Sequence, residues 1–87
     1  MNTTGSGIRI KQLREERDMS MENLVADLNR LYDLKLTKSM VSRWERDIHD
    51  PSLTYAKYLV QYFNVSLDWL IGLTDKRTPP QFRKEGR

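Results

Sequence analysis

Residues 38–46 carry, at helical spacing, side chains of the kinds that bind nucleic acids. The basic and hydroxyl groups that recur at positions i, i+1, i+4 and i+5, and so share one face of a helix, are Lys38, Ser39, Ser42 and Arg43. Ammonium, guanidinium and hydroxyl groups donate hydrogen bonds to phosphate oxygens and to base edges in the DNA major groove. Val41 and Trp44 fall on the opposite side, where they would anchor the helix to a core. The pattern therefore predicts a helix that binds duplex DNA.

The residues at the two ends of this segment extend the candidate site. Thr37 is suited to cap the helix at its amino terminus, where backbone N–H groups also attract phosphate. Arg46 at the other end either contacts phosphate or only compensates the helix dipole. For Ser39 and Ser42, contact with DNA and simple solvation stay open as alternatives.

The rest of the chain predicts helices that can position this segment. Apolar residues recur at helical spacing, and no run alternates with the period of a strand. The expected helices span residues 8–18, 21–32, 38–46, 53–63 and 67–71. Hydroxyl side chains suited to helix capping precede all but the first of them: Ser20, Thr37, Ser52 and Ser66. A helix, a turn over 33–36 and a short helix with a basic face together make a helix-turn-helix arrangement.

Length and charge indicate one small domain with flexible ends. The chain has 87 residues, 38% of them hydrophobic and 31% charged, which suits a single folded domain. We expect a flexible lead over 1–7, a domain over 8–74, and a basic mobile tail or linker over 75–87, which contains the pair Pro79-Pro80. The net charge is +3, but the positive charge is concentrated in the tail. DNA binding would therefore depend on the local basic face of residues 38–46.

The composition argues against several other classes of protein. The chain has no cysteine and one histidine, and it lacks a glycine-rich phosphate loop. We therefore expect no enzyme activity, no cofactor, no metal and no small-molecule ligand. No apolar stretch is long enough to span a membrane, and the first residues do not resemble a signal peptide, so we expect a cytoplasmic protein.

Several short motifs occur in an order that is typical of one family. They are Ile8 to Arg14, Met19 to Leu24, Ser42 to Glu45, Pro51-Ser52 and Asn64 to Gly72. Over about residues 8–73 the chain resembles the Cro/C1 (Xre-type) phage-repressor helix-turn-helix domain. The resemblance implies an all-α, compact, five-helix lambda-repressor-like fold. It also implies a repressor of transcription that binds a palindromic double-stranded DNA operator as a homodimer.

The resemblance also assigns roles to single residues. The family positions that contact bases fall on the polar face already described. A structural ion pair would join Arg14 to Glu45, and the contact between subunits would involve Trp69, Leu70 and Leu73.

Three features depart from the family pattern. The stretch between Ala26 and Ser42 is several residues longer than usual. Met21 stands where the family often has a phosphate-binding glutamine, and a methionine side chain cannot donate a hydrogen bond. Asp47 occupies a position usually held by glycine, where a left-handed backbone is expected.

Two other interpretations remain open. The chain could be an antitoxin or another protein-interaction module with the same fold, in which case a partner would bind the short tail from Lys76. It could also be a fragment of a longer repressor, with Pro79-Pro80 leading to an oligomerisation or effector domain.

Overall fold

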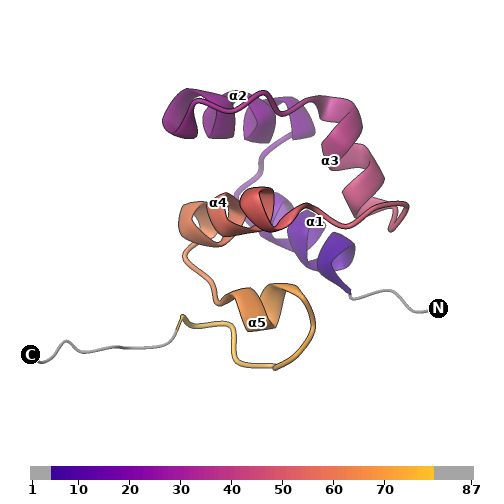
Figure 1. Ribbon diagram of the computed structural model, residues 1–87, viewed down its shortest axis with the longest axis vertical. Helices are drawn as coiled ribbons and strands as arrows, with labels where there is room; N and C mark the ends of the chain where they lie inside the picture. Colours follow the sequence, from indigo (N-terminus) through magenta and orange to yellow (C-terminus); the bar gives the residue numbers. More distant parts are fainter. Residues whose placement is uncertain (1–4, 80–87) are drawn as a thin grey trace, which may run out of the picture.

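The computed structural model describes residues 5–79, and this part of the chain contains five α-helices and no strand. They are α1 (Ser6–Glu16), α2 (Met21–Tyr32), α3 (Lys38–Glu45), α4 (Leu53–Phe63) and α5 (Leu67–Leu70). In Figure 1, α2 and α3 lie at the top, α1 and α4 cross the middle, and α5 lies below them. The all-α, five-helix prediction is confirmed. No helix in this range is long and apolar enough to cross a membrane.

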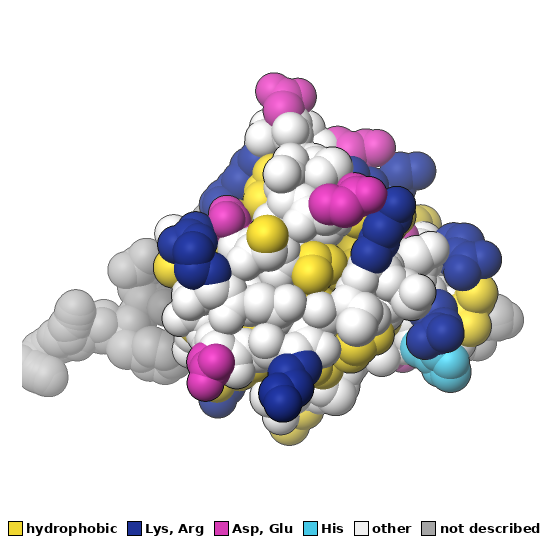
Figure 2. Space-filling view, turned by 90° about the horizontal axis from the view of Figure 1, so that it is seen from above, with side chains coloured by type: hydrophobic (Ala, Val, Ile, Leu, Met, Phe, Trp, Pro, Cys, Tyr) yellow, Lys and Arg dark blue, Asp and Glu magenta, His cyan; other side chains and the backbone are white. Residues whose placement is uncertain are grey.

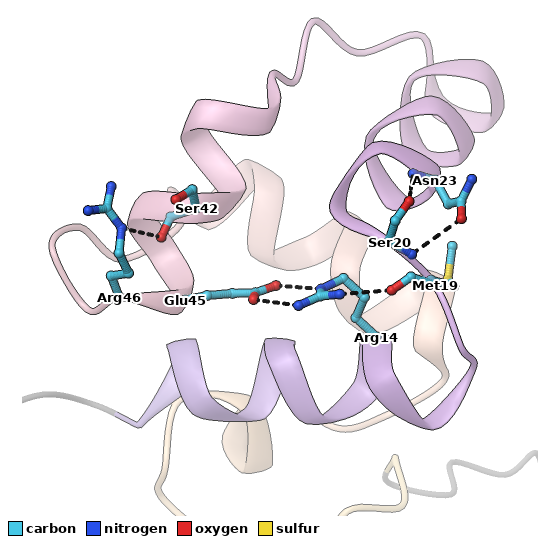
Figure 3. Close-up of polar contacts among 7 residues, drawn as sticks. All are labelled: Arg14, Met19, Ser20, Asn23, Ser42, Glu45 and Arg46. Atoms are coloured by element: carbon cyan, nitrogen blue, oxygen red, sulfur yellow. Dashed lines mark hydrogen bonds and ion pairs between the residues drawn. The ribbon is translucent and has the colours of Figure 1, made fainter.

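Hydroxyl caps fix where four of the helices begin, as the sequence predicts. The side-chain oxygen of each capping residue accepts a hydrogen bond from the backbone N–H three residues further on, in α2, α3, α4 and α5: Ser20 from Asn23, Thr37 from Met40, Ser52 from Tyr55 and Ser66 from Trp69. The side-chain oxygen of Asn23 in turn accepts a hydrogen bond from the backbone N–H of Ser20, which completes a capping box (Figure 3).

α1 begins at Ser6, two residues earlier than predicted, and ends at Glu16. Ser6 and Gly7, expected in a flexible lead, are buried in its first turn. Ser6 Oγ donates to Asp50 Oδ1 at 3.1 Å. At Gly7 a Cβ atom would lie 2.0 Å from the carbonyl oxygen of Trp44, so only glycine permits this approach of α1 to α3. Residues 1–4 of the expected lead lie outside the described residues.

One apolar core joins the helices. Its fully buried side chains come from all five helices, since α1 contributes Ile10, α2 contributes Leu24 and Leu28, α3 contributes Val41, α4 contributes Leu59 and α5 contributes Leu70. α1 packs against both α3 and α5, and α2 packs against both α3 and α4. α3 therefore packs mainly on α1 and α2, and Trp44 also meets Tyr55 of α4, with 5.6 Å between the ring centres.

The chain after α5 folds back on the body as far as it is described. Ser66 donates twice to this segment, from its backbone N–H to the Arg77 carbonyl at 2.9 Å and from Oγ to the Lys76 carbonyl at 3.1 Å. The Arg77 guanidinium pairs with the carboxylate of Glu16 in α1 and lies 5.1 Å from the ring centre of Trp69. Lys76 and Arg77 are thus fixed to α1 and α5, which differs from the mobile tail expected from residue 75. Residues 80–87 of that tail lie outside the described residues.

Candidate nucleic-acid interface

The outward face of α3 brings together the predicted polar residues. Lys38, Ser39, Ser42, Arg43 and Arg46 line one shallow, open hollow of about 230 Å³. All of them are exposed except Ser42, which is half-buried. On the other side of the helix, Val41 and Trp44 are buried in the core, as the sequence predicts. The helix therefore presents ammonium, guanidinium and hydroxyl donors side by side, with its apolar stripe turned inward.

The carboxyl end of α3 differs by one residue from the prediction. The helix ends at Glu45, and Arg46 is its C-cap. The Nε atom of Arg46 lies 3.4 Å from the carbonyl oxygen of Ser42 (Figure 3), a long hydrogen bond that places the guanidinium beside the negative end of the helix dipole. Asp47 follows with φ 59°, the left-handed conformation expected at this position.

A bidentate ion pair holds α3 against α1. Arg14 Nε donates to Glu45 Oε2 at 2.8 Å, and Nη2 donates to Oε1 at 2.9 Å. Arg14 Nη1 also donates to the backbone carbonyl of Met19 at 2.8 Å, so one guanidinium joins α1, α3 and the start of α2 (Figure 3). The side chains of Arg14 and Glu45 are only 12% and 3% exposed. The hydrogen bond to Glu45 raises the pKa of Arg14. The expected pair is present, and it fixes which side of α3 faces outward.

The longer connection between α2 and α3 is taken up by an ordered loop. α2 continues to Tyr32, and Asp33 ends it in the left-handed conformation, with φ 56°. Asn29 then holds the loop with two hydrogen bonds to the backbone of Leu36, one from Nδ2 to its carbonyl at 2.9 Å and one from its N–H to Oδ1 at 2.8 Å. Leu36 itself is buried. The extra residues therefore leave the start of α3 at Lys38 undisturbed.

Comparison with known proteins shows to which family this arrangement of helices belongs. A sequence model of the family described as helix-turn-helix matches residues 10–70, which include most of α1 and all of α2 to α5. The chain belongs to the helix-turn-helix family. It is also similar to an uncharacterized HTH-type transcriptional regulator, YobD, of Bacillus subtilis (strain 168), with 30% identity over 76 residues. The match covers 87% of this chain, which spans 62% of the length of that relative.

Within this helix-turn-helix domain the structure adds one residue that the sequence did not assign to the site. Glu22, in the first turn of α2, accepts a hydrogen bond from Lys38 Nζ at 2.9 Å. Lys38 lowers the pKa of Glu22, chiefly through this bond. Sequence reasoning does not identify this pair, because nothing local to Glu22 marks a partner sixteen residues away. Figure 2 looks down on the side of the molecule where α2 and α3 lie, and acidic side chains stand among the basic ones there.

The predicted contact between subunits needs correction. Trp69 and Leu70 are only 6% and 0% exposed, so both belong to the core of the helix-turn-helix domain and offer almost no surface to a second subunit. Trp69 is covered by two guanidinium groups, with Arg9 4.7 Å and Arg77 5.1 Å from its ring centre. Arg9 also donates to the backbone carbonyl of Trp69. Of the three residues only Leu73 remains available, at 72% exposed.

Proposed function

We propose that the chain is the DNA-binding domain of a sequence-specific transcriptional regulator, a phage-type repressor that places α3 in the major groove of its operator. The observation that carries this proposal is the outward row of donors on α3. Membership of the helix-turn-helix family supports it, and so does the similarity to YobD, an HTH-type transcriptional regulator. By occupying the operator, the protein would block the polymerase.

Different residues along α3 would contact the bases and the phosphates. Arg43 and Lys38 have the charge and reach to bind guanine N7 and O6, a contact that discriminates between bases. Ser39 and Ser42 can donate to either bases or phosphates. Arg46, as the C-cap, and Thr37, as the N-cap, stand at the two ends, where a groove-bound helix passes the phosphate backbone. Phosphate contacts would orient the domain, and the residues between the caps would select the sequence.

A palindromic operator requires two copies of the chain related by a two-fold axis. Each copy would put its α3 into one half-site, with the half-sites about 34–36 Å apart on one side of the duplex. The exposed side chain of Leu73, which follows α5, is the remaining candidate for the contact between copies.

Selection from a pool of random duplexes tests the proposal. The full chain should enrich one sequence with inverted half-sites spaced by about one helical turn. Sedimentation of the complex should give two chains per duplex. A chain that enriches no sequence, at a salt concentration low enough to permit binding, would contradict the proposal. Enrichment of a single, unrepeated half-site would contradict binding as a dimer but would still support sequence recognition.

A further inference from the structure

The amino-terminal ends of α2 and α3 meet through a single ion pair at the edge of the candidate interface. Lys38 Nζ lies 2.9 Å from Glu22 Oε2, and the two side chains are 60% and 64% exposed. Water and salt screen an exposed pair, so this contact adds little to the stability of the fold. What it does change is the set of groups that the start of α3 offers to DNA.

An unpaired lysine at this place would be a flexible point charge, attracted to any phosphate that came near it. Glu22 cancels that charge locally and takes up one of the three N–H donors of the ammonium group. Two donors remain, and they stand beside a carboxylate that can accept further hydrogen bonds. The pair is thus poor at holding phosphate, because the carboxylate repels it, but it can bind a surface that offers acceptors next to a donor.

A G·C base pair offers such a surface in the major groove. Guanine presents two neighbouring acceptors, N7 and O6, and cytosine presents the N4 amino donor beside them. An A·T pair instead places the adenine N6 donor between two acceptors, so two donors from one ammonium group cannot meet adjacent acceptors there.

We propose that Glu22 and Lys38 act together as a reader of one G·C base pair in each half-site. Lys38 donates to guanine N7 and O6, and Glu22 accepts from cytosine N4. This inference rests on the proposed function, since it names the base pair that the same interface selects. It makes Glu22, a residue of α2, a determinant of specificity in addition to the residues of α3.

The test compares duplex selection by the full-length wild type with that by E22Q and K38M, at one fixed salt concentration. D68N serves as the matched control, because it removes one negative charge from α5, on the side of the fold away from α2 and α3 (Figure 1). The wild type and D68N should prefer G·C at one position of each half-site by roughly ten-fold. E22Q and K38M should reduce the preference at that position to about two-fold or less and leave the other positions unchanged. E22Q should also bind random duplex more tightly than the wild type, since it lacks the repelling carboxylate.

The two proposals fail in different ways. If the wild type selects an operator and E22Q keeps every base preference, the Glu22–Lys38 pair is not a reader, and the proposed function stands. A preference lost in K38M but kept in E22Q likewise overturns the role of Glu22. If the wild type selects no sequence at all, the proposed function itself is wrong, and the inference falls with it.

Discussion

Arg14 and Glu45, 31 residues apart in the sequence, form a two-pronged ion pair at 2.8 and 2.9 Å that joins α1 to α3. The pair lies on the inner side of α3, away from the donors that line the outer hollow. A third bond, from Arg14 to the carbonyl of Met19, ties the start of α2 to the same guanidinium. The orientation of the candidate interface therefore depends on one arginine outside the interface.

Replacing Arg14 with methionine should destabilise the fold by about 3 kcal/mol, because the buried carboxylate of Glu45 would be left without its partner. Urea unfolding, followed by the helical circular dichroism signal, measures this loss. The double variant R14M/E45L should be more stable than R14M alone, since it buries no unpaired charge. If the double variant loses as much unfolding free energy as R14M and E45L lose in sum, the two side chains do not interact.

Gly7→Ala should be strongly destabilising, by about 2 kcal/mol or more, because the new methyl group would overlap the Trp44 carbonyl and approach Asp47 Oδ1 at 2.7 Å. The neighbouring change Ile8→Ala serves as control, since Ile8 is largely exposed and its loss should matter little. Thermal unfolding of both variants gives the comparison. Equal melting temperatures for the wild type and Gly7→Ala would contradict the close approach of α1 to α3.

The positions of the helices, and which of their faces are buried, could be predicted from local sequence patterns. The contacts between residues far apart in the sequence could not. Hydroxyl caps act within one turn, so Ser20, Thr37, Ser52 and Ser66 could be identified as N-caps from the sequence. The burial of Val41 and Trp44 followed from spacing in the same way.

The start of α1 was missed for a physical reason. Glycine and serine are poor helix formers, and the need for Gly7 arises from the carbonyl of Trp44, which only folding brings near. Trp69 was misplaced at a subunit contact because its covering residues, Arg9 and Arg77, come from the two ends of the domain. The hydrogen bond between Glu22 and Lys38 likewise joins two helices, and no pattern in the sequence near either residue indicates it.

Thr37→Ala should lower the stability by about 1 kcal/mol, because it removes the hydroxyl that accepts from the N–H of Met40 at 3.2 Å. Thr37→Ser keeps the hydroxyl and should stay within a few tenths of a kcal/mol of the wild type. Urea unfolding of the three proteins tests the cap. If alanine and serine give the same stability, the hydroxyl does not hold the start of α3.

The contact between Arg77 and Glu16 should make stability depend on pH in the acid range. Hydrogen bonds from Arg77, and to a lesser extent from Gln12, lower the pKa of Glu16 from 4.5 to about 2. A carboxylate whose pKa is lower in the folded state stabilises the fold fully above its unfolded pKa, and this stabilisation is lost as the pH falls towards the folded value. The unfolding free energy of the wild type should therefore decrease between about pH 4.5 and pH 2.

Arg77→Met should show a smaller decrease over the same range than the wild type. Lys76→Met is the matched control, since it removes a neighbouring charge while its backbone carbonyl can still accept from Ser66. If the unfolding free energies of the wild type and Arg77→Met depend on pH in the same way, the ion pair between Arg77 and Glu16 does not stabilise the fold.

The most direct measurement of the central claim is the ratio of operator affinity to random-duplex affinity for Arg43→Ala, with Arg30→Ala as an exposed arginine control on α2. Arg43→Ala should keep its helical signal and lose roughly ten-fold or more of that ratio, because a guanidinium bound to guanine contributes about 1–3 kcal/mol of discrimination. Arg30→Ala should leave the ratio unchanged. An Arg43→Ala protein that is folded and discriminates as well as the wild type would contradict the assignment of α3 as the helix that recognises DNA.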